Sequence, residues 1–92
     1  MKKIWKFKLR HDVDVQVVRV PRASEPLTAG WVGEDLILWA IIDTDEAPHG
    51  ADLEVLVVGT GRSITGDFDQ YHYLATSRRQ DGVVAHVFWR RT

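Results

Sequence analysis

Seven consecutive apolar residues, Leu36–Ile42, constrain the fold of this chain more than any other feature. The run is too short to span a membrane, and it has no helical alternation of apolar and polar positions. Its isoleucine content and its acidic flanks, Asp35 and Asp43, favour a β-strand that is buried on both faces. One small sheet in 92 residues can hardly cover both faces of such a strand. The run therefore predicts a sandwich, a barrel or a subunit interface.

Composition excludes several classes of protein. A length of 92 residues predicts one domain, residues 1–92, and the absence of cysteine excludes disulfides, thiolate zinc sites and thiol nucleophiles. Twelve basic and thirteen acidic residues nearly balance, so we expect no general attraction to nucleic acid. The start Met1–Lys6 is basic but lacks the apolar stretch of a signal peptide, and we expect no membrane segment. These features predict a cytoplasmic protein.

The rest of the chain alternates short apolar stretches with turn residues, and no stretch of ten residues has a convincing helical period. We expect a bulge or a bend at Val17–Val18, where the apolar positions change phase, and a two-residue type I′ hairpin turn at Asp81–Gly82. The pattern predicts an all-β domain, a small sandwich or partly closed barrel of about seven mostly antiparallel strands. The predicted strands are Lys3–Leu9, Val13–Val20, Leu27–Val32, Leu36–Ile42, Leu53–Val58, Tyr71–Ser77 and Val83–Trp89.

The most distinctive local motif is Gly59-Thr60-Gly61-Arg62, which directly follows a predicted strand. Glycines let backbone N–H groups approach an anion, and arginine can form a bidentate contact with phosphate. The nucleotide-binding signatures with similar glycines require a helix after the loop, and none is predicted here. The alternative interpretation is a tight strand exit in which only glycine fits the backbone.

Histidines and acidic residues give no metal or catalytic pattern. The four histidines lack metal-ligand spacing, and we expect no metal and no cofactor. His86 lies in an apolar strand on the same face as Val84 and Phe88, which is typical of a hydrogen-bonded core residue or of a pocket-lining one. Asp43, Asp45 and Glu46 form an acidic loop without the ligand series of a calcium site. No catalytic residue can be assigned, so an enzyme such as a hydrolase or nuclease is not expected.

Short motifs along almost the whole chain resemble a family of short proteins encoded by tailed phages and prophages. The matching pieces are Ile4-Trp5-Lys6-Phe7, Val20-Pro21, Leu38-Trp39-Ala40 with Asp43, Val58-Gly59-Thr60-Gly61, Tyr73-Leu74-Ala75-Thr76 and His86-Val87-Phe88. The resemblance implies a phage accessory protein with no assigned enzyme activity, acting in the cytoplasm of the host cell. Phage β-proteins of similar size include sponges that capture nucleotide immune signals between subunits, an analogy of size and origin.

Two functions follow from these observations. The first is an oligomeric binding protein that sequesters a small nucleotide-like anion as an anti-defence sponge. Arg62 would hold phosphate, Gly59–Gly61 would offer N–H groups, and Trp31 or Tyr73 would stack on a base, with His86 as a further pocket residue. The alternative is a module that binds or inhibits a host protein through its aromatic side chains. Because the central strand lacks alternation, we also expect a homo-oligomer.

Overall fold

The structure, a computed structural model, describes residues 1–45, 51–64 and 66–92. Its regular elements are seven strands and one turn of 3₁₀ helix, η1, at Phe68–Gln70. The strands are β1 Lys2–Leu9, β2 Val15–Val20, β3 Glu25–Val32, β4 Asp35–Asp43, β5 Ala51–Gly59, β6 His72–Arg78 and β7 Val84–Arg91. The all-β prediction is confirmed, and each predicted strand corresponds to one of these elements.

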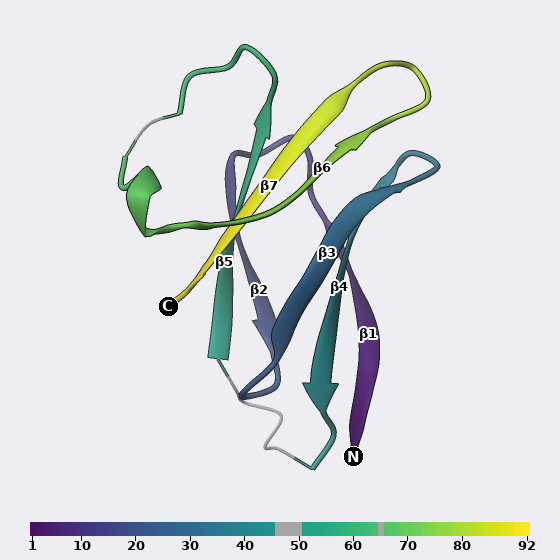
Figure 1. Cartoon of the computed structure of the whole chain (residues 1–92), viewed down its shortest axis with the longest axis vertical. Coiled ribbons are helices and arrows are strands. Elements are labelled where there is room, and N and C mark those ends of the chain that lie inside the picture. The colour runs from purple at the N-terminus through teal and green to yellow at the C-terminus, as the bar shows by residue number, and fades with distance from the viewer. Residues whose placement is uncertain (46–50, 65) are drawn as a thin grey trace.

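The described strands form two antiparallel sheets rather than one closed barrel. The first sheet has the order β1-β4-β3, and the second has the order β2-β5-β7-β6. The chain passes between the sheets after β1, after β2 and after β4, and Figure 1 shows the two layers packed together. Of the two architectures predicted from the sequence, the structure therefore has the small sandwich.

The core lies between the two sheets, because every second side chain of each strand points inward. Leu36 and Leu38 of β4 meet Leu53, Val55 and Val57 of β5 in one buried cluster. Their neighbours in the same cluster are Leu9, Val20, Ala29, Ala85 and Val87. The predicted run Leu36–Ile42 is the central strand of its sheet, and its alternate residues Leu36, Leu38, Ala40 and Ile42 are fully buried.

The outer faces of the sandwich are also partly apolar. On the second sheet Leu56 and Val58 point outward and are nevertheless buried. The segment before β6 lies over this face, where the Phe68 ring meets the Phe88 ring edge-on at 4.9 Å between centroids. On the first sheet the outward residues Trp39 and Ile41 are half-buried, and Ile4 beside them is 62% exposed. The chain therefore covers one of its two apolar outer faces better than the other.

The last hairpin exists as predicted, but its turn and register differ from the prediction. The predicted two-residue turn would place Arg79 opposite Val84, whereas Arg78 is the residue opposite Val84. The N–H of Arg79 donates to the Val83 carbonyl, and the N–H of Gly82 donates to the Arg79 carbonyl at 2.8 Å. Gly82, with φ of +96°, therefore closes a three-residue loop. The sequence Asp-Gly suits both loops, because each needs a residue with positive φ.

The predicted bulge at Val17–Val18 is wrong. β2 pairs with β5 in unbroken register from Val15 to Val20. Gln16 shares the inner face with Val18 and Val20, and its amide exchanges two hydrogen bonds with the backbone of Arg10, at 2.8 and 2.6 Å. Because Gln16 is a polar residue on the inner face of β2, the apolar positions along the chain gave the false appearance of a change of phase. In the predicted Asp43–Gly50 loop, Glu46–Gly50 lie outside the described residues, as does Thr65.

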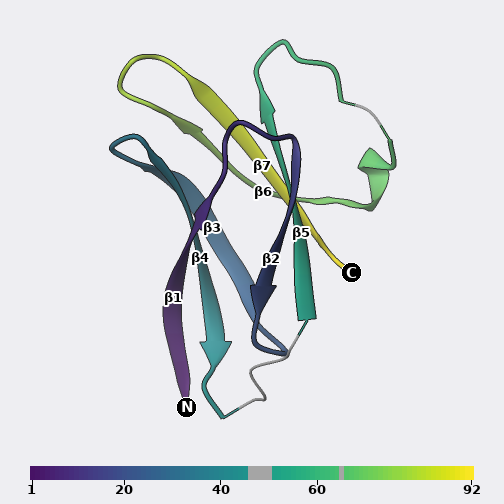
Figure 2. The ribbon, with the colours of Figure 1, turned by 180° about the vertical axis from the view of Figure 1, so that it is seen from behind.

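The two long sides of the sandwich are closed to different degrees. On one side β3 lies beside β6, and the backbone N–H of Trp31 donates to Ser77 Oγ at 3.1 Å. On the other side β1 and β2 leave their common loop and spread apart along the sandwich (Figure 2). Both are edge strands, each paired with one neighbour. The sandwich is therefore sealed along β3 and β6 and open along β1 and β2.

Candidate ligand-binding site

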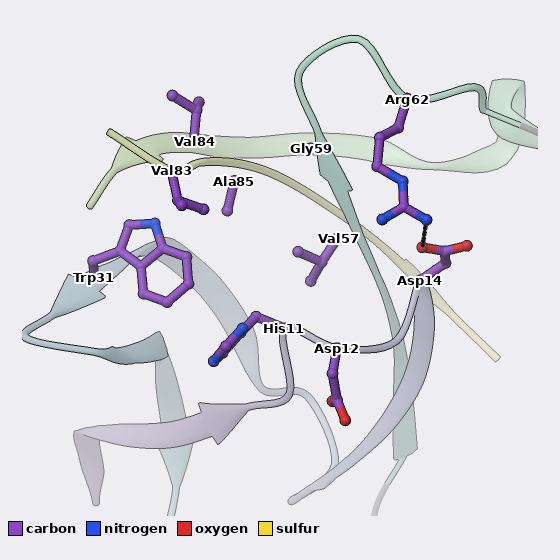
Figure 3. A pocket seen from close by; sticks show the side chains of 10 residues that line it. All are labelled: His11, Asp12, Asp14, Trp31, Val57, Gly59, Arg62, Val83, Val84 and Ala85. Atoms are coloured by element: carbon purple, nitrogen blue, oxygen red, sulfur yellow. Dashed lines mark ion pairs between the residues drawn. The ribbon is translucent and has the colours of Figure 1, made fainter. Parts of the chain in front are cut away.

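A pocket of about 280 Å³ lies at the end of the sandwich where four connections meet. Its walls come from the β1–β2 loop, the end of β3, the end of β5 with the turn that follows, and the start of β7. Figure 3 shows the Trp31 indole on one side and the Arg62 guanidinium on the other, with His11 and Val57 between them. The floor is formed by the apolar residues Val57 and Ala85, which are buried.

The Gly59-Thr60-Gly61-Arg62 motif is a tight turn that directs Arg62 to this pocket. The Arg62 N–H donates to the Gly59 carbonyl at 3.1 Å, and Gly61 has a φ of +85°, which favours glycine. A Cβ atom at Gly59 would lie 3.4 Å from Cδ of Arg62, so the arginine stem packs directly over this glycine. The tight strand exit is therefore present, and the positive φ of Gly61 gives the backbone reason for glycine at that position.

Two ion pairs set the charge of the pocket. Nη2 of Arg62 lies 3.8 Å from the Asp14 carboxylate, and both side chains are exposed. Asp12 accepts two hydrogen bonds from the Arg10 guanidinium, at 3.1 and 3.0 Å, and these bonds lower the pKa of Asp12. Each carboxylate is therefore balanced by an arginine. The Asp14–Arg62 pair is long and solvated, so an anionic ligand can compete for Arg62 at little cost.

Trp31 is fixed in place by its neighbours. Its indole N–H donates to the Ser77 carbonyl at 3.1 Å, and the His11 ring meets it at 66° with 5.1 Å between centroids. The Arg79 guanidinium lies over the indole at 4.8 Å from the centroid, and Asp81 holds this arginine through two hydrogen bonds. The same contact lowers the pKa of Asp81 to about 2. The hairpin turn thus supports the tryptophan wall of the pocket.

The residues predicted as one binding site from the sequence fall into two groups. Gly59, Arg62 and Trp31 line the pocket, and Gly61 forms the turn beside it. The other three predicted residues lie on the outer face of the second sheet in a row of side-chain hydrogen bonds. Thr76 Oγ1 joins the Tyr73 hydroxyl at 2.8 Å to His86 Nδ1 at 3.1 Å, and His86 Nε2 meets Thr60 Oγ1 at 2.7 Å.

This row explains His86 as a satisfied residue. Both ring nitrogens have hydroxyl partners, and the ring shares the outer face with Phe88, as predicted. The polar pocket residues His11, Asp12 and Asp14 were missed by the sequence analysis. The pattern indicates only a turn at His11 and Asp12, and Asp14 falls in the predicted strand Val13–Val20, although β2 begins at Val15. Their position beside Trp31 and Arg62 depends on how the two sheets pack.

A third polar cluster, also missed, anchors the segment before β6. The carboxylate of Glu54 accepts a hydrogen bond from the Tyr71 hydroxyl and one from Arg90 Nε at 2.6 Å. The hydrogen bond from Tyr71, followed by that from Arg90, lowers the pKa of Glu54. Burial, followed by the contact with Glu54, raises the pKa of Tyr71. Glu54 and Arg90 lie directly opposite each other on β5 and β7. Opposite charges at paired positions are a recognisable signal, but the pairing could be predicted only if the register of the two strands were known.

The Glu54 cluster predicts a specific pH dependence of stability. The folded-state pKa of Glu54 is depressed, so its contribution is present above the ordinary carboxyl pKa and is lost as pH falls toward the folded value. We expect wild type to be more stable than Glu54→Gln at pH 7, with the difference shrinking from about pH 5 to pH 3. Thermal unfolding of both proteins across this range measures it. A stability difference that stays constant with pH would contradict the lowered pKa of Glu54 in the folded state.

The described residues provide neither a metal-binding cluster nor a membrane-spanning helix. Among those residues no group of three or more His, Asp or Glu side chains is placed to hold a metal ion. No helix there is long and apolar enough to cross a membrane. The arrangement that remains is an aromatic wall, a cation and an apolar floor around one hollow, which suits binding of a small planar molecule.

Fold and site together define a small antiparallel β-sandwich with a pocket at one end. A family model described as "domain of unknown function (DUF7352)" matches residues 1–92, and the chain therefore belongs to the DUF7352 family. Comparison with curated proteins gave no match, and comparison with solved structures gave none either.

Proposed function

We propose that this chain is a non-enzymatic binding protein that captures a small, planar, anionic molecule of the nucleotide type. The observation that carries the proposal is the pocket of about 280 Å³ with Trp31 and Arg62 on opposite walls. A ring would stack on the indole face turned away from Arg79, while Arg62 would bind phosphate oxygens. The motifs shared with tailed-phage proteins extend the proposal to a phage-encoded sponge for a nucleotide immune signal.

The local charges favour an anion that is compact and of low charge. Arg62 is the cation nearest the pocket, and Asp14 is its partner at 3.8 Å. A phosphate group that replaces Asp14 keeps a charge-assisted contact for the arginine and gains bidentate geometry. The Asp14 carboxylate would repel a ligand with several phosphates on that side. A nucleoside monophosphate or cyclic nucleotide therefore fits better than a triphosphate.

Isothermal titration of the purified protein tests this function. The panel consists of cyclic mononucleotides, cyclic dinucleotides, ADP-ribose derivatives and ATP. We expect heat of binding for at least one ligand with a single phosphate per base, and weaker binding of ATP. No heat for any member of the panel at millimolar concentration would remove the proposal.

We further propose that the protein is a homo-oligomer, with the outer face of the first sheet as the interface. Ile4, Trp39 and Ile41 form the apolar centre of this face. A twofold axis through this apolar centre would bury it between two copies, as in an isologous contact.

Light scattering at micromolar concentration is expected to report at least twice the chain mass of 10.5 kDa. Ile4→Glu is expected to lower the measured mass to that of one chain, because it places a charge in the apolar centre. Val17→Glu is the matched control, since Val17 is 60% exposed on the other sheet. A wild-type mass of one chain would contradict the interface.

A further inference from the structure

The open side of the sandwich is a basic groove, which the proposed small-molecule site does not use. A hollow of about 770 Å³ runs between β1 and β2. Four cations line it, Lys6 and Lys8 from β1, Arg10 from the loop and Arg19 from β2. Its remaining lining is apolar apart from Gln16, and no carboxylate belongs to it within the described chain. A site of this composition attracts negative charge.

The groove cations other than Arg10, which donates two hydrogen bonds to Asp12, are available to a partner. β1 carries four lysines and no acidic residue in eight positions. Lys8 and Arg19 have carboxylate neighbours, Asp35 and Asp52, each at 3.3 Å in exposed pairs. Exposed pairs of this kind contribute little and exchange readily. Lys6 has no carboxylate within 4 Å among the residues that the structure describes.

The backbone of the groove is also available. Among the strands that the structure describes, β1 pairs only with β4, and β2 pairs only with β5. Along an edge strand, alternate N–H and C=O groups point away from the sheet and can accept a further strand. Figure 2 shows β1 and β2 as the two strands that border the open side. An added strand would meet the free edge of β1.

The alternation of β1 defines the side chains that such a strand needs. Ile4, Lys6 and Lys8 point to the outer face, whereas Trp5 and Phe7 point toward the space between the sheets. A strand with acidic residues at every second position would place them beside the lysines. The apolar residues between them would then lie against Trp5 and Phe7, both of which are incompletely buried.

We propose that this groove binds an extended segment of a partner protein with alternating acidic and apolar residues, by strand addition to β1. Charge excludes a second copy of this chain, because two such grooves would bring Lys6, Lys8 and Arg19 of both copies together. Single-stranded nucleic acid is disfavoured because valines dominate the apolar lining and Phe7 is its one aromatic ring. The lysines would also repel basic strands and would not attract neutral ones, which gives specificity.

The test uses an acetylated, fluorescein-labelled peptide of four Glu-Val repeats and measures fluorescence anisotropy at low and high salt. We expect saturable binding that weakens as salt rises. Lys6→Glu/Lys8→Glu should reduce affinity about tenfold or more, and the milder Lys6→Gln/Lys8→Gln should reduce it less. Arg22→Glu/Arg78→Glu, with the same change in charge at exposed positions outside the groove, should leave binding unchanged.

Three further probes separate strand addition from other kinds of binding. Methylation of alternate peptide nitrogens should abolish binding, and amide hydrogen exchange should show new protection in β1 with the unmodified peptide. Equal binding of the methylated peptide, or of a Lys-Val repeat, would overturn the proposal. So would tighter binding of an oligothymidylate or no binding at 1 mM.

Discussion

Leu38→Ala is expected to destabilise the protein by about 2–5 kcal/mol. Leu38 is 0% exposed in the central strand β4, and in the register it lies between Phe7 of β1 and Ala29 of β3. Shortening this side chain removes buried methyl groups and leaves a cavity. The hydrogen-bonded sheets around the cavity cannot move together far enough to close it. Domains of this size have a total stability of roughly 5–15 kcal/mol, so the loss is a large fraction.

Urea unfolding monitored by circular dichroism measures this effect as a lower transition midpoint with an unchanged slope. Leu27→Ala is the matched control, because Leu27 is a leucine in the neighbouring strand β3 and is 43% exposed. We expect the control to cost about 1 kcal/mol or less. Equal losses for both variants would show that the inner face of the first sheet is assigned wrongly.

Arg62→Ala is expected to weaken binding of the anionic ligand by roughly 10- to 150-fold, the value of one charge-assisted phosphate contact. Its effect on folding should be small, because the Arg62–Asp14 pair is exposed and 3.8 Å long. Asp14→Asn should strengthen binding by about two- to fivefold, because Arg62 then has no competing carboxylate. The two substitutions thus change the affinity in opposite directions.

Calorimetric titration of the three proteins measures these changes. Arg78→Ala is the matched control, since Arg78 is exposed on β6 and does not line the pocket. A ligand that is cationic would reverse both signs, with weaker binding to Asp14→Asn. Unchanged affinity in folded Arg62→Ala would place the ligand elsewhere, whatever the outcome at the β1–β2 groove.

The strands were predictable because each depends on local composition. A run such as Leu36–Ile42 can form a buried strand but has neither the length of a membrane helix nor its flanks. Lys2–Leu9 alternates strictly from Trp5 to Leu9, so its inner and outer faces follow from period two alone. The hairpin before β7 was equally visible at Asp81–Gly82.

The predictions that were wrong concerned details that depend on contacts between residues distant in the sequence. Gln16 faces inward because its amide satisfies the backbone of Arg10, so an inner polar residue mimicked a bulge. Gly82 supplies positive φ to a three-residue loop as readily as to a two-residue one, and only the pairing of Arg78 with Val84 decides the register. That register also places Arg79 over Trp31.

The sequence by itself determined the all-β class, the number of strands and their positions along the chain, and the turn at Gly59–Arg62, because backbone preferences and side-chain alternation act over a few residues. Only the tertiary structure decided that Trp31 and Arg62 share a pocket while Thr60, Tyr73 and His86 lie on another face. It also decided that Phe68 lies against the outer face of one sheet and that β1 and β2 remain open edges. These outcomes depend on how two sheets stack and which edges meet, and residues far apart in the sequence carry no local signal of either.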